Sequence, residues 1–370
     1  MNSIREDYIN EMSNEGAINT FLGSIAFFLF SYNAIHPRNI FLIIASFLGI
    51  IYFILTLFRT EIDNRFLIFG SLLLIGSLFN LPFSKNGIGG SLVLLGTLSI
   101  SVFCIRNITT TLFYSFIVLL YFCIIIFNGI VIQGEDSYFL FDYMGKSRNY
   151  IGYLLVTYSS LYYFLSVLCK KKPSVLLLSV VVFLCFLAQG RTSLGMSLLL
   201  LLGSIILIGE GRRLGITFFM IIVLCVLLYS TRVLLGLWYE SSNFSSKQLE
   251  SARYTIWNSY FKSLSICDII YGKDLNTVPL IREWDGNVHN SYLKFHARVG
   301  LIGVIPFLLL LLRSLVIIIK DNRILFIPVI ALLIRIFFDS DMLIGELDFV
   351  LYTILWIPVM GIYNNSENYK

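Results

Sequence analysis

The sequence predicts an all-α, polytopic integral membrane protein, and three observations lead to this class. The 370 residues are 57% hydrophobic and only 13% charged, and the mean hydropathy is +0.84. Soluble domains, by contrast, are about 25% charged. Apolar stretches recur along the whole chain, and about 20 such residues cross a hydrocarbon core of roughly 30 Å as a helix. Residues 1–370 are therefore expected to form a single integral membrane domain.

These apolar stretches are expected to be helices rather than strands of a membrane barrel. Lipid offers no hydrogen-bond partner to the backbone, so a spanning segment must satisfy its own amide and carbonyl groups. The alternation of a barrel strand is missing from the run 40–58. Apolar length and polar interruptions predict about twelve spans. They cover residues 18–35, 40–58, 66–83, 88–105, 112–132, 150–169, 173–189, 193–209, 214–236, 299–319, 324–342 and 347–363.

The positive charges of the loops predict the orientation of these spans. Lys and Arg concentrate in alternate loops, for example at 170–172 and 212–213, and such loops face the cytoplasm. Both termini are therefore expected in the cytoplasm, and the longest loop, 237–290, on the opposite side. The net charge of +5 is attributed to loops near an anionic leaflet, so nucleic acid is not expected as a partner. All cysteines except Cys267 lie in apolar runs, which predicts no disulfide framework.

The large loop is expected to contain an interfacial helix. Within 249–266, helical spacing places five apolar or aromatic residues on one stripe. These are Ile256, Trp257, Tyr260, Phe261 and Leu264. A helix of this kind can lie in the membrane surface with its aromatic side chains toward the headgroups. A turn-rich passage, 271–287, follows, and a further helix is predicted to begin near His289.

Two positions in the loops have residue types suited to catalysis. Arg191 stands between two apolar runs, where a guanidinium is costly unless an anion offsets it; alternatively, it marks a short outer loop and extends to the headgroups. His289 follows a loop rich in Gly, Asn and Asp, and a neutral imidazole can accept a proton from a hydroxyl. The alternative is a histidine that only hydrogen-bonds the backbone.

Further charged residues lie near the same side of the membrane. Arg335 and Asp339 are four residues apart on a predicted helix, a spacing that favours an ion pair. Arg232 lies near the outer end of the ninth predicted span. Each of these residues has a structural interpretation beside a functional one. No His or Cys pattern of the zinc-binding kind and no Gly-rich phosphate loop occurs in the sequence.

Three short stretches, in this order, resemble motifs of the bacterial O-antigen polymerase (Wzy) and O-antigen ligase family. Residues 189–194, QGRTSL, are similar to the family's Ser-Arg-Thr segment at the start of a transmembrane helix. Residues 251–257, SARYTIW, resemble its Ser-Gly-Arg-x-x-x-Trp element, with alanine in place of glycine. Residues 289–293, HNSYL, followed by GLIG at 300–303, form the most specific match. The first 150 residues resemble the family only as serial helices.

The resemblance implies a GT-C-like membrane glycosyltransferase of the bacterial inner membrane, with an active site facing the periplasm. In that family setting, Arg191 and Arg253 bind the pyrophosphate of an undecaprenyl-linked sugar, because a guanidinium presents a planar fork of donors to phosphate oxygens. His289 is then the catalytic base. Asn290, Tyr292, Arg232, Arg335 and Asp339 are candidates for supporting roles. The lipid pyrophosphate is already activated, so neither a cofactor nor a metal is expected.

The leading functional hypothesis is an O-antigen polymerase that joins lipid-linked repeat units by an inverting single displacement. Its partners would be undecaprenyl-pyrophosphate-linked oligosaccharides, membrane lipids and a chain-length-regulating co-polymerase. The first alternative is an O-antigen ligase, which transfers the polymer to lipid A-core. The second is a lipid-linked oligosaccharide flippase, although transporters gather polar groups near the bilayer midplane.

Overall fold

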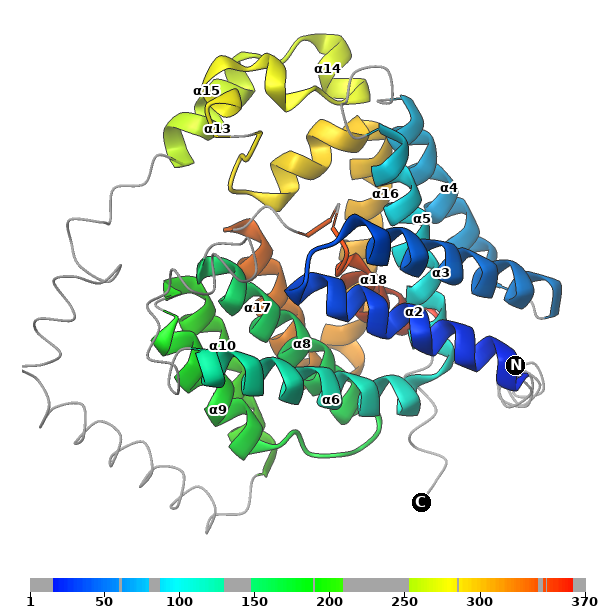
Figure 1. The fold of residues 1–370 in the computed structure, drawn as a ribbon, viewed down its shortest axis with the longest axis vertical. Coiled ribbons are helices and arrows are strands. Elements are labelled where there is room, and N and C mark those ends of the chain that lie inside the picture. Colours follow the sequence, from blue (N-terminus) through cyan, green and yellow to red (C-terminus); the bar gives the residue numbers. More distant parts are fainter. Residues whose placement is uncertain are drawn as a thin grey trace, which may run out of the picture. The chain divides into compact units, whose positions relative to one another are not determined.

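The computed structural model describes residues 16–59, 62–79, 87–129, 148–188, 190–208, 253–284, 286–338, 342–343 and 345–361. Helices make up most of these residues, and no strand occurs among them (Figure 1). The predicted all-α class is thus confirmed for the described part of the chain.

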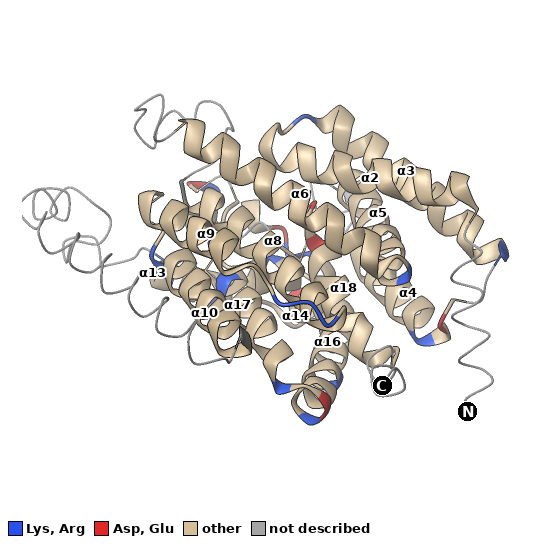
Figure 2. Ribbon diagram, turned by 90° about the horizontal axis from the view of Figure 1, so that it is seen from below, with Lys and Arg blue, Asp and Glu red and all other residues tan. Residues whose placement is uncertain are grey.

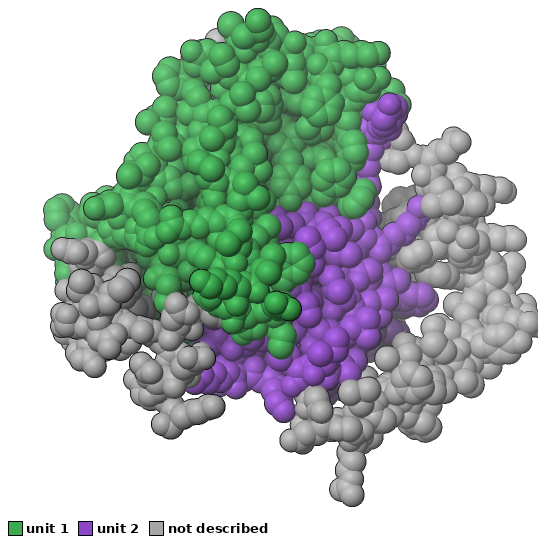
Figure 3. Space-filling view, turned by 180° about the vertical axis from the view of Figure 1, so that it is seen from behind, with its two compact units in different colours: residues 1–114, 255–326, 336–370 green, residues 115–254, 327–335 purple. Residues whose placement is uncertain are grey.

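The chain divides into two compact units, coloured separately in Figure 3. Unit 1 comprises the described residues of 1–114, 255–326 and 336–370, and unit 2 those of 115–254 and 327–335. Unit 1 contains α2 (Ala17–Ile35), α3 (Asn39–Arg59), α4 (Asn64–Phe79), α5 (Gly87–Arg106), nearly all of α13 (Arg253–Lys262), α14 (Ile266–Tyr271), η4 (Leu275–Thr277), α15 (Pro279–Arg282), α16 (Ser291–Asp321), η5 (Arg323–Leu325) and α18 (Asp348–Val359). Unit 2 contains most of α6 (Ile108–Phe127), α8 (Arg148–Leu168), α9 (Val175–Leu187), α10 (Arg191–Ile208) and most of α17 (Phe326–Phe337).

Within the described residues, six helices are long and apolar enough to cross a membrane: α2, α3, α5, α6, α8 and α16. The helices α4, α9, α10 and α18 are apolar but shorter. Large apolar side chains cover exposed helix surfaces, for example Phe58, Leu309 and Val316. Most of the ribbon carries no charge (Figure 2). Because such surfaces are unfavourable in water, the protein is membrane-embedded.

Every predicted span except 214–236 coincides with a helix, and 214–236 lies outside the described residues. For the third predicted span, 66–83, the structure describes α4 up to Phe79, and residues 80–83 lie outside the described part of the chain. The last, 347–363, is α18 and ends at Val359. Apolar length therefore located these helices well, while the number that cross the membrane stays a prediction.

Helix α16 is broken near its start and closely packed against α4. Gly300 has φ +57 and ψ −167 inside α16, which divides the helix into two parts. Beside the break, Gly76 of α4 approaches so closely that an added Cβ would lie 2.7 Å from the Val299 carbonyl oxygen. Glycine is needed at both positions, at Gly300 for the backbone conformation and at Gly76 for the close approach. The break places the first part of α16 next to α13, α14 and α15 (Figure 1).

In unit 2, the starts of α8 and α10 lie against each other. A Cβ on Gly152 would lie 2.2 Å from the Ser193 hydroxyl oxygen. At the other end, Ser204 of α10 donates to the Pro173 carbonyl (2.9 Å). Ser174 begins α9 by accepting from the Leu177 amide (3.3 Å), as an N-cap serine does. Arg191 is the first residue of α10 and so stands at the contact between two helix starts.

The predicted interfacial stripe packs inside the protein. Ile256 and Tyr260 of α13 are buried in a small core together with Val278, Ile281, Val288 and Ala297. Trp257 and Leu264 pack against the same core, and of the five residues only Phe261 is largely exposed. The expectation that this stripe faces the headgroups was therefore wrong for four of its five residues, which pack with α15 and the start of α16.

Candidate functional site

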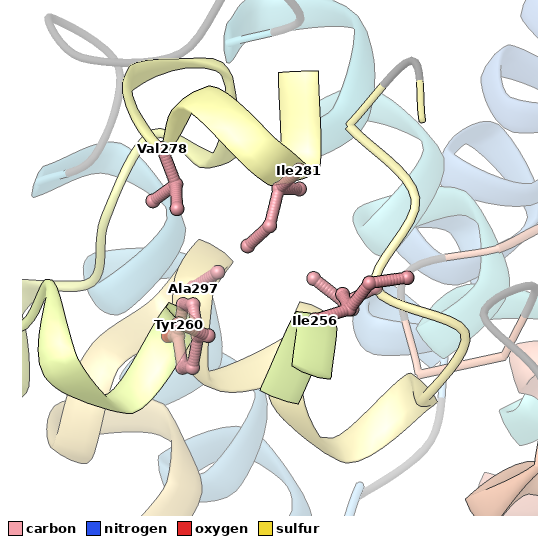
Figure 4. Packing of buried hydrophobic residues seen from close by; sticks show 6 residues of the cluster. Ile256, Tyr260, Val278, Ile281 and Ala297 are labelled. Atoms are coloured by element: carbon pink, nitrogen blue, oxygen red, sulfur yellow. The ribbon is translucent and has the colours of Figure 1, made fainter. Parts of the chain in front are cut away.

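The segment from α13 to the start of α16 folds around its own hydrophobic core. Figure 4 shows the core side chains of Ile256 and Tyr260 from α13, Val278 and Ile281 from the start of α15, and Ala297 from α16. The indole of Trp257 also donates to the Val288 carbonyl at 2.9 Å. These contacts join α13 to the residue that immediately precedes His289. The position of His289 is therefore fixed by packing and by a hydrogen bond, rather than left to a long loop.

The backbone of His289 is held in a conformation that few non-glycine residues adopt. Its φ is +50, in the left-handed region, which is unfavourable for a residue with a Cβ. Its amide donates to the Asn287 side-chain oxygen at 2.8 Å, and its half-buried ring stands edge-on to Trp284 with centroids 5.6 Å apart. Strained residues that the surrounding structure holds in place are concentrated at functional sites.

The residues after His289 start α16. Asn290 is buried, and its side-chain oxygen accepts from the Leu293 amide (3.1 Å) to cap the helix. Ser291, also buried, accepts from the Met342 amide (3.3 Å). The ring of Tyr292 lies 6.1 Å from that of Phe337. Asn290 thus has a structural role as a cap, and the chain brings His289, Asn290 and Tyr292 together at one helix start.

The two candidate arginines of the pyrophosphate site also stand at helix starts. Arg191 begins α10 and Arg253 begins α13, and both are half-buried. A helix N-terminus carries partial positive charge and free amide donors, which favours a nearby anion. Arg191 and Arg253 belong to unit 2 and His289 to unit 1. Their assembly into one site stays a prediction from the motifs.

Arg335 is a buried arginine of unit 2. It is only 2% exposed, and its guanidinium donates to the Asn149 carbonyl at 2.6 Å and lies 5.9 Å from the centre of the Tyr153 ring. Both partners belong to the first turns of α8, which also contact Ser193 through Gly152. Arg335 therefore stabilises the region beside Arg191. The predicted partner Asp339 and the candidate Arg232 lie outside the described residues.

The sequence did not reveal three polar contacts of unit 1. Tyr260 and His296 are hydrogen-bonded at 2.6 Å, and the other ring nitrogen of His296 lies 3.1 Å from the Ile269 carbonyl oxygen. Burial raises the pKa of the Tyr260 phenol, so the hydroxyl stays protonated. Asp348, fully buried, accepts from the Gly345 amide at 2.9 Å. An acidic residue at the start of an apolar helix was the available signal for Asp348.

No family model, curated protein or solved structure matches the chain. The described residues and the motif resemblance together point to the same groups. The site offers a half-buried imidazole on a strained backbone and two guanidinium groups at helix starts. These are groups for proton transfer and for binding an anion.

Proposed function

We propose that the protein is a glycosyltransferase that joins undecaprenyl-pyrophosphate-linked oligosaccharide units into a polysaccharide at the periplasmic face of a bacterial inner membrane, as an O-antigen polymerase does. The observation that carries the proposal is the placement of His289. It lies between the compact segment from α13 to α15 and the long apolar helix α16, and its conformation is held by Asn287 and by the neighbouring core. The sugar of a lipid-linked donor would lie at the membrane surface, which is where the proposed topology puts His289.

In the proposed reaction, His289 accepts the proton of the attacking sugar hydroxyl. The hydroxyl oxygen forms a bond to the anomeric carbon of the donor, and the bond from that carbon to the pyrophosphate oxygen breaks. The lipid pyrophosphate leaves with the electron pair, and Arg191 and Arg253 stabilise its charge. A single displacement inverts the configuration at the anomeric carbon.

The chain's membrane character supports this substrate class. The polyprenyl tail of the donor is soluble only in a bilayer, and the exposed apolar helix surfaces of both units are suited to contact with such tails. The donor already contains the leaving group, so the reaction needs no nucleotide. A partner co-polymerase that sets chain length belongs to the same proposal.

A strain lacking the gene tests the proposed reaction. Loss of a polymerase leaves lipopolysaccharide with a single repeat unit, and reintroducing the wild-type chain restores the ladder of lengths. Bare lipid A-core in the deletion strain would instead indicate a ligase and would contradict the polymerase assignment. A normal ladder in the deletion strain would exclude both.

A further inference from the structure

Helix α14 carries an apolar surface that faces away from the protein. Ile266 is 78% exposed, Ile269 38%, Ile270 39% and Tyr271 40%, and Phe261 at the end of α13 is 58% exposed. We call these five residues the α14 face. Four of them belong to a helix of only six residues. An apolar surface this concentrated is unfavourable in water.

The polar groups of α14 are satisfied within the same segment. Ser265 and Asp268 form a reciprocal capping box at the start of the helix. Lys273 donates to the Asp268 carboxylate at 2.9 Å. Burial would raise the pKa of Asp268, but its hydrogen bonds with Lys273 and Ser265 lower it. The exposed part of α14 is therefore left to its apolar side chains.

Helix α14 is attached to the break in α16. The Lys273 amide donates to the Ala297 carbonyl at 2.8 Å. A Cβ on Gly300 would lie 2.1 Å from the Ile270 carbonyl oxygen, so the backbones of α14 and α16 touch at the break. The position of α14 along α16 is thus set by the point at which α16 changes direction.

The α14 face adjoins exposed apolar residues of α4, and the part of α16 after the break also exposes apolar residues. The Tyr271 ring lies 5.6 Å from that of Phe79, the last residue of α4. Phe79 itself is exposed, as is Leu78 beside it. Between the break and Leu312, the exposed residues of α16 are large and apolar: Ile305, Leu308, Leu309 and Leu312. The first exposed charge of α16 beyond the break is Arg313, more than three turns from Gly300. The exposed apolar surface of α4 thus continues onto α14 at Tyr271.

We propose that the α14 face is a lipid-binding surface that lies in the boundary between headgroups and acyl chains, on the side of the membrane where α4 ends. Amphipathic helices bind at this depth through their apolar side chains. Lys262, exposed at the end of α13 beside Phe261, suits anionic headgroups. The interfacial element is thus α14, while α13 packs on the core beneath it.

The proposal also gives the small core a mechanical role. Tyr260 of α13 and Ala297 of α16 belong to the same core, so this core joins the two helices. Lipid contact at α14 would therefore hold the segment that ends at His289 at a fixed depth in the membrane. This inference stands independently of the proposed function. A lipid-facing α14 is compatible with any chemistry at His289.

Cys267 provides a native probe, because it lies on α14 and is exposed. The full-length protein would be labelled with a nitroxide and placed in nanodiscs of phosphatidylcholine and phosphatidylglycerol. Collision rates of the label with oxygen, which concentrates in lipid, and with a water-soluble nickel complex would then be measured. We expect the ratio of the oxygen collision rate to the nickel collision rate to be severalfold higher at Cys267 than at a matched position in water.

The matched position is Glu283, an exposed carboxylate at the end of α15 in the same segment. Its label is introduced as Glu283→Cys in a Cys267→Ser background, and Cys267→Ser alone reports any label on other cysteines. Equal access of the nickel complex at Cys267 and Glu283 would overturn the proposal. Protection at Cys267 that disappears in nanodiscs holding a single copy would indicate a contact between copies and would overturn it as well.

Discussion

The hydroxyl of Tyr260 lies 2.6 Å from Nδ1 of His296 and joins α13 to the first part of α16. Nε2 of His296 is 3.1 Å from the Ile269 carbonyl oxygen. A carbonyl can only accept, so Nε2 carries the proton, and Nδ1 of the neutral ring accepts from Tyr260. One side chain thereby connects α13, α14 and α16, and two of these helices, α13 and α16, contribute residues to the core next to His289.

Removing either partner of this contact is expected to loosen the segment. Tyr260→Phe leaves Nδ1 of His296 without its donor, and His296→Ala removes both hydrogen bonds of the ring. Each change should lower the free energy of unfolding by about 1–3 kcal/mol. In a double-mutant cycle the two changes should couple by about 1 kcal/mol. Thermal unfolding in nanodiscs gives these values, and strictly additive effects would show that the contact contributes nothing.

Gly300→Ala is expected to be among the most damaging small substitutions. The residue has φ +57, and the new Cβ would meet the Ile270 carbonyl oxygen. Backbone strain at such a position costs about 1–3 kcal/mol. The clash with Ile270 adds to this cost, because α14 must shift to make room for the new Cβ. Gly89→Ala in α5 is the control, because no atom lies within 4 Å of its Cβ position. Equal melting temperatures for the two variants would contradict the proposed packing at the break.

The Asp268–Lys273 pair predicts a dependence of stability on pH. Hydrogen bonds with Lys273 and Ser265 outweigh burial and lower the pKa of Asp268 below its ordinary value of 3.8. A lowered carboxyl pKa contributes stability that is fully present above the unfolded value and is lost as the pH falls through the folded value. Protection of α14 from hydrogen exchange should therefore decrease below about pH 4. Asp268→Asn should remove this pH dependence, and an unchanged profile in the variant would rule out Asp268 as its source.

Arg335 is expected to be structurally sensitive because its guanidinium is buried. Arg335→Met removes the donor to the Asn149 carbonyl, which should cost about 1–3 kcal/mol. Arg323→Met, at an exposed arginine of η5, should change stability by less than about 0.5 kcal/mol. The two melting temperatures provide the comparison. If Arg335→Met unfolded at the wild-type temperature, the buried hydrogen bond would have no stabilising role.

The positions of the helices could be predicted because membrane spans are encoded locally. A run of apolar residues must be helical in lipid, and its ends follow from polar residues such as those beyond Phe79 and Lys170. The sequence also predicted a helix start near His289, and α16 begins at Ser291. These features depend only on residues that are close together in the sequence.

The packing of the large loop could not be predicted in the same way. Helical spacing shows that Ile256 and Tyr260 share a face, but it does not show what covers that face. Here the cover is Val278, Ile281 and Ala297 rather than lipid. Likewise, local spacing could not reveal the hydrogen bond from Arg335 to the Asn149 carbonyl, 186 residues away; the predicted partner Asp339 lies outside the described residues. Contacts over such separations have no signature in a single sequence.

The most direct test of the proposed function is polymer formation by the purified protein. Wild-type protein in proteoliposomes would receive an undecaprenyl-pyrophosphate-linked oligosaccharide, and the products would be separated by length. We expect a ladder of products with the wild type, and loss of the ladder with His289→Ala, while His296→Gln at the nearby structural histidine keeps it. A folded His289→Ala variant that forms the same ladder as the wild type would contradict the central role proposed for His289.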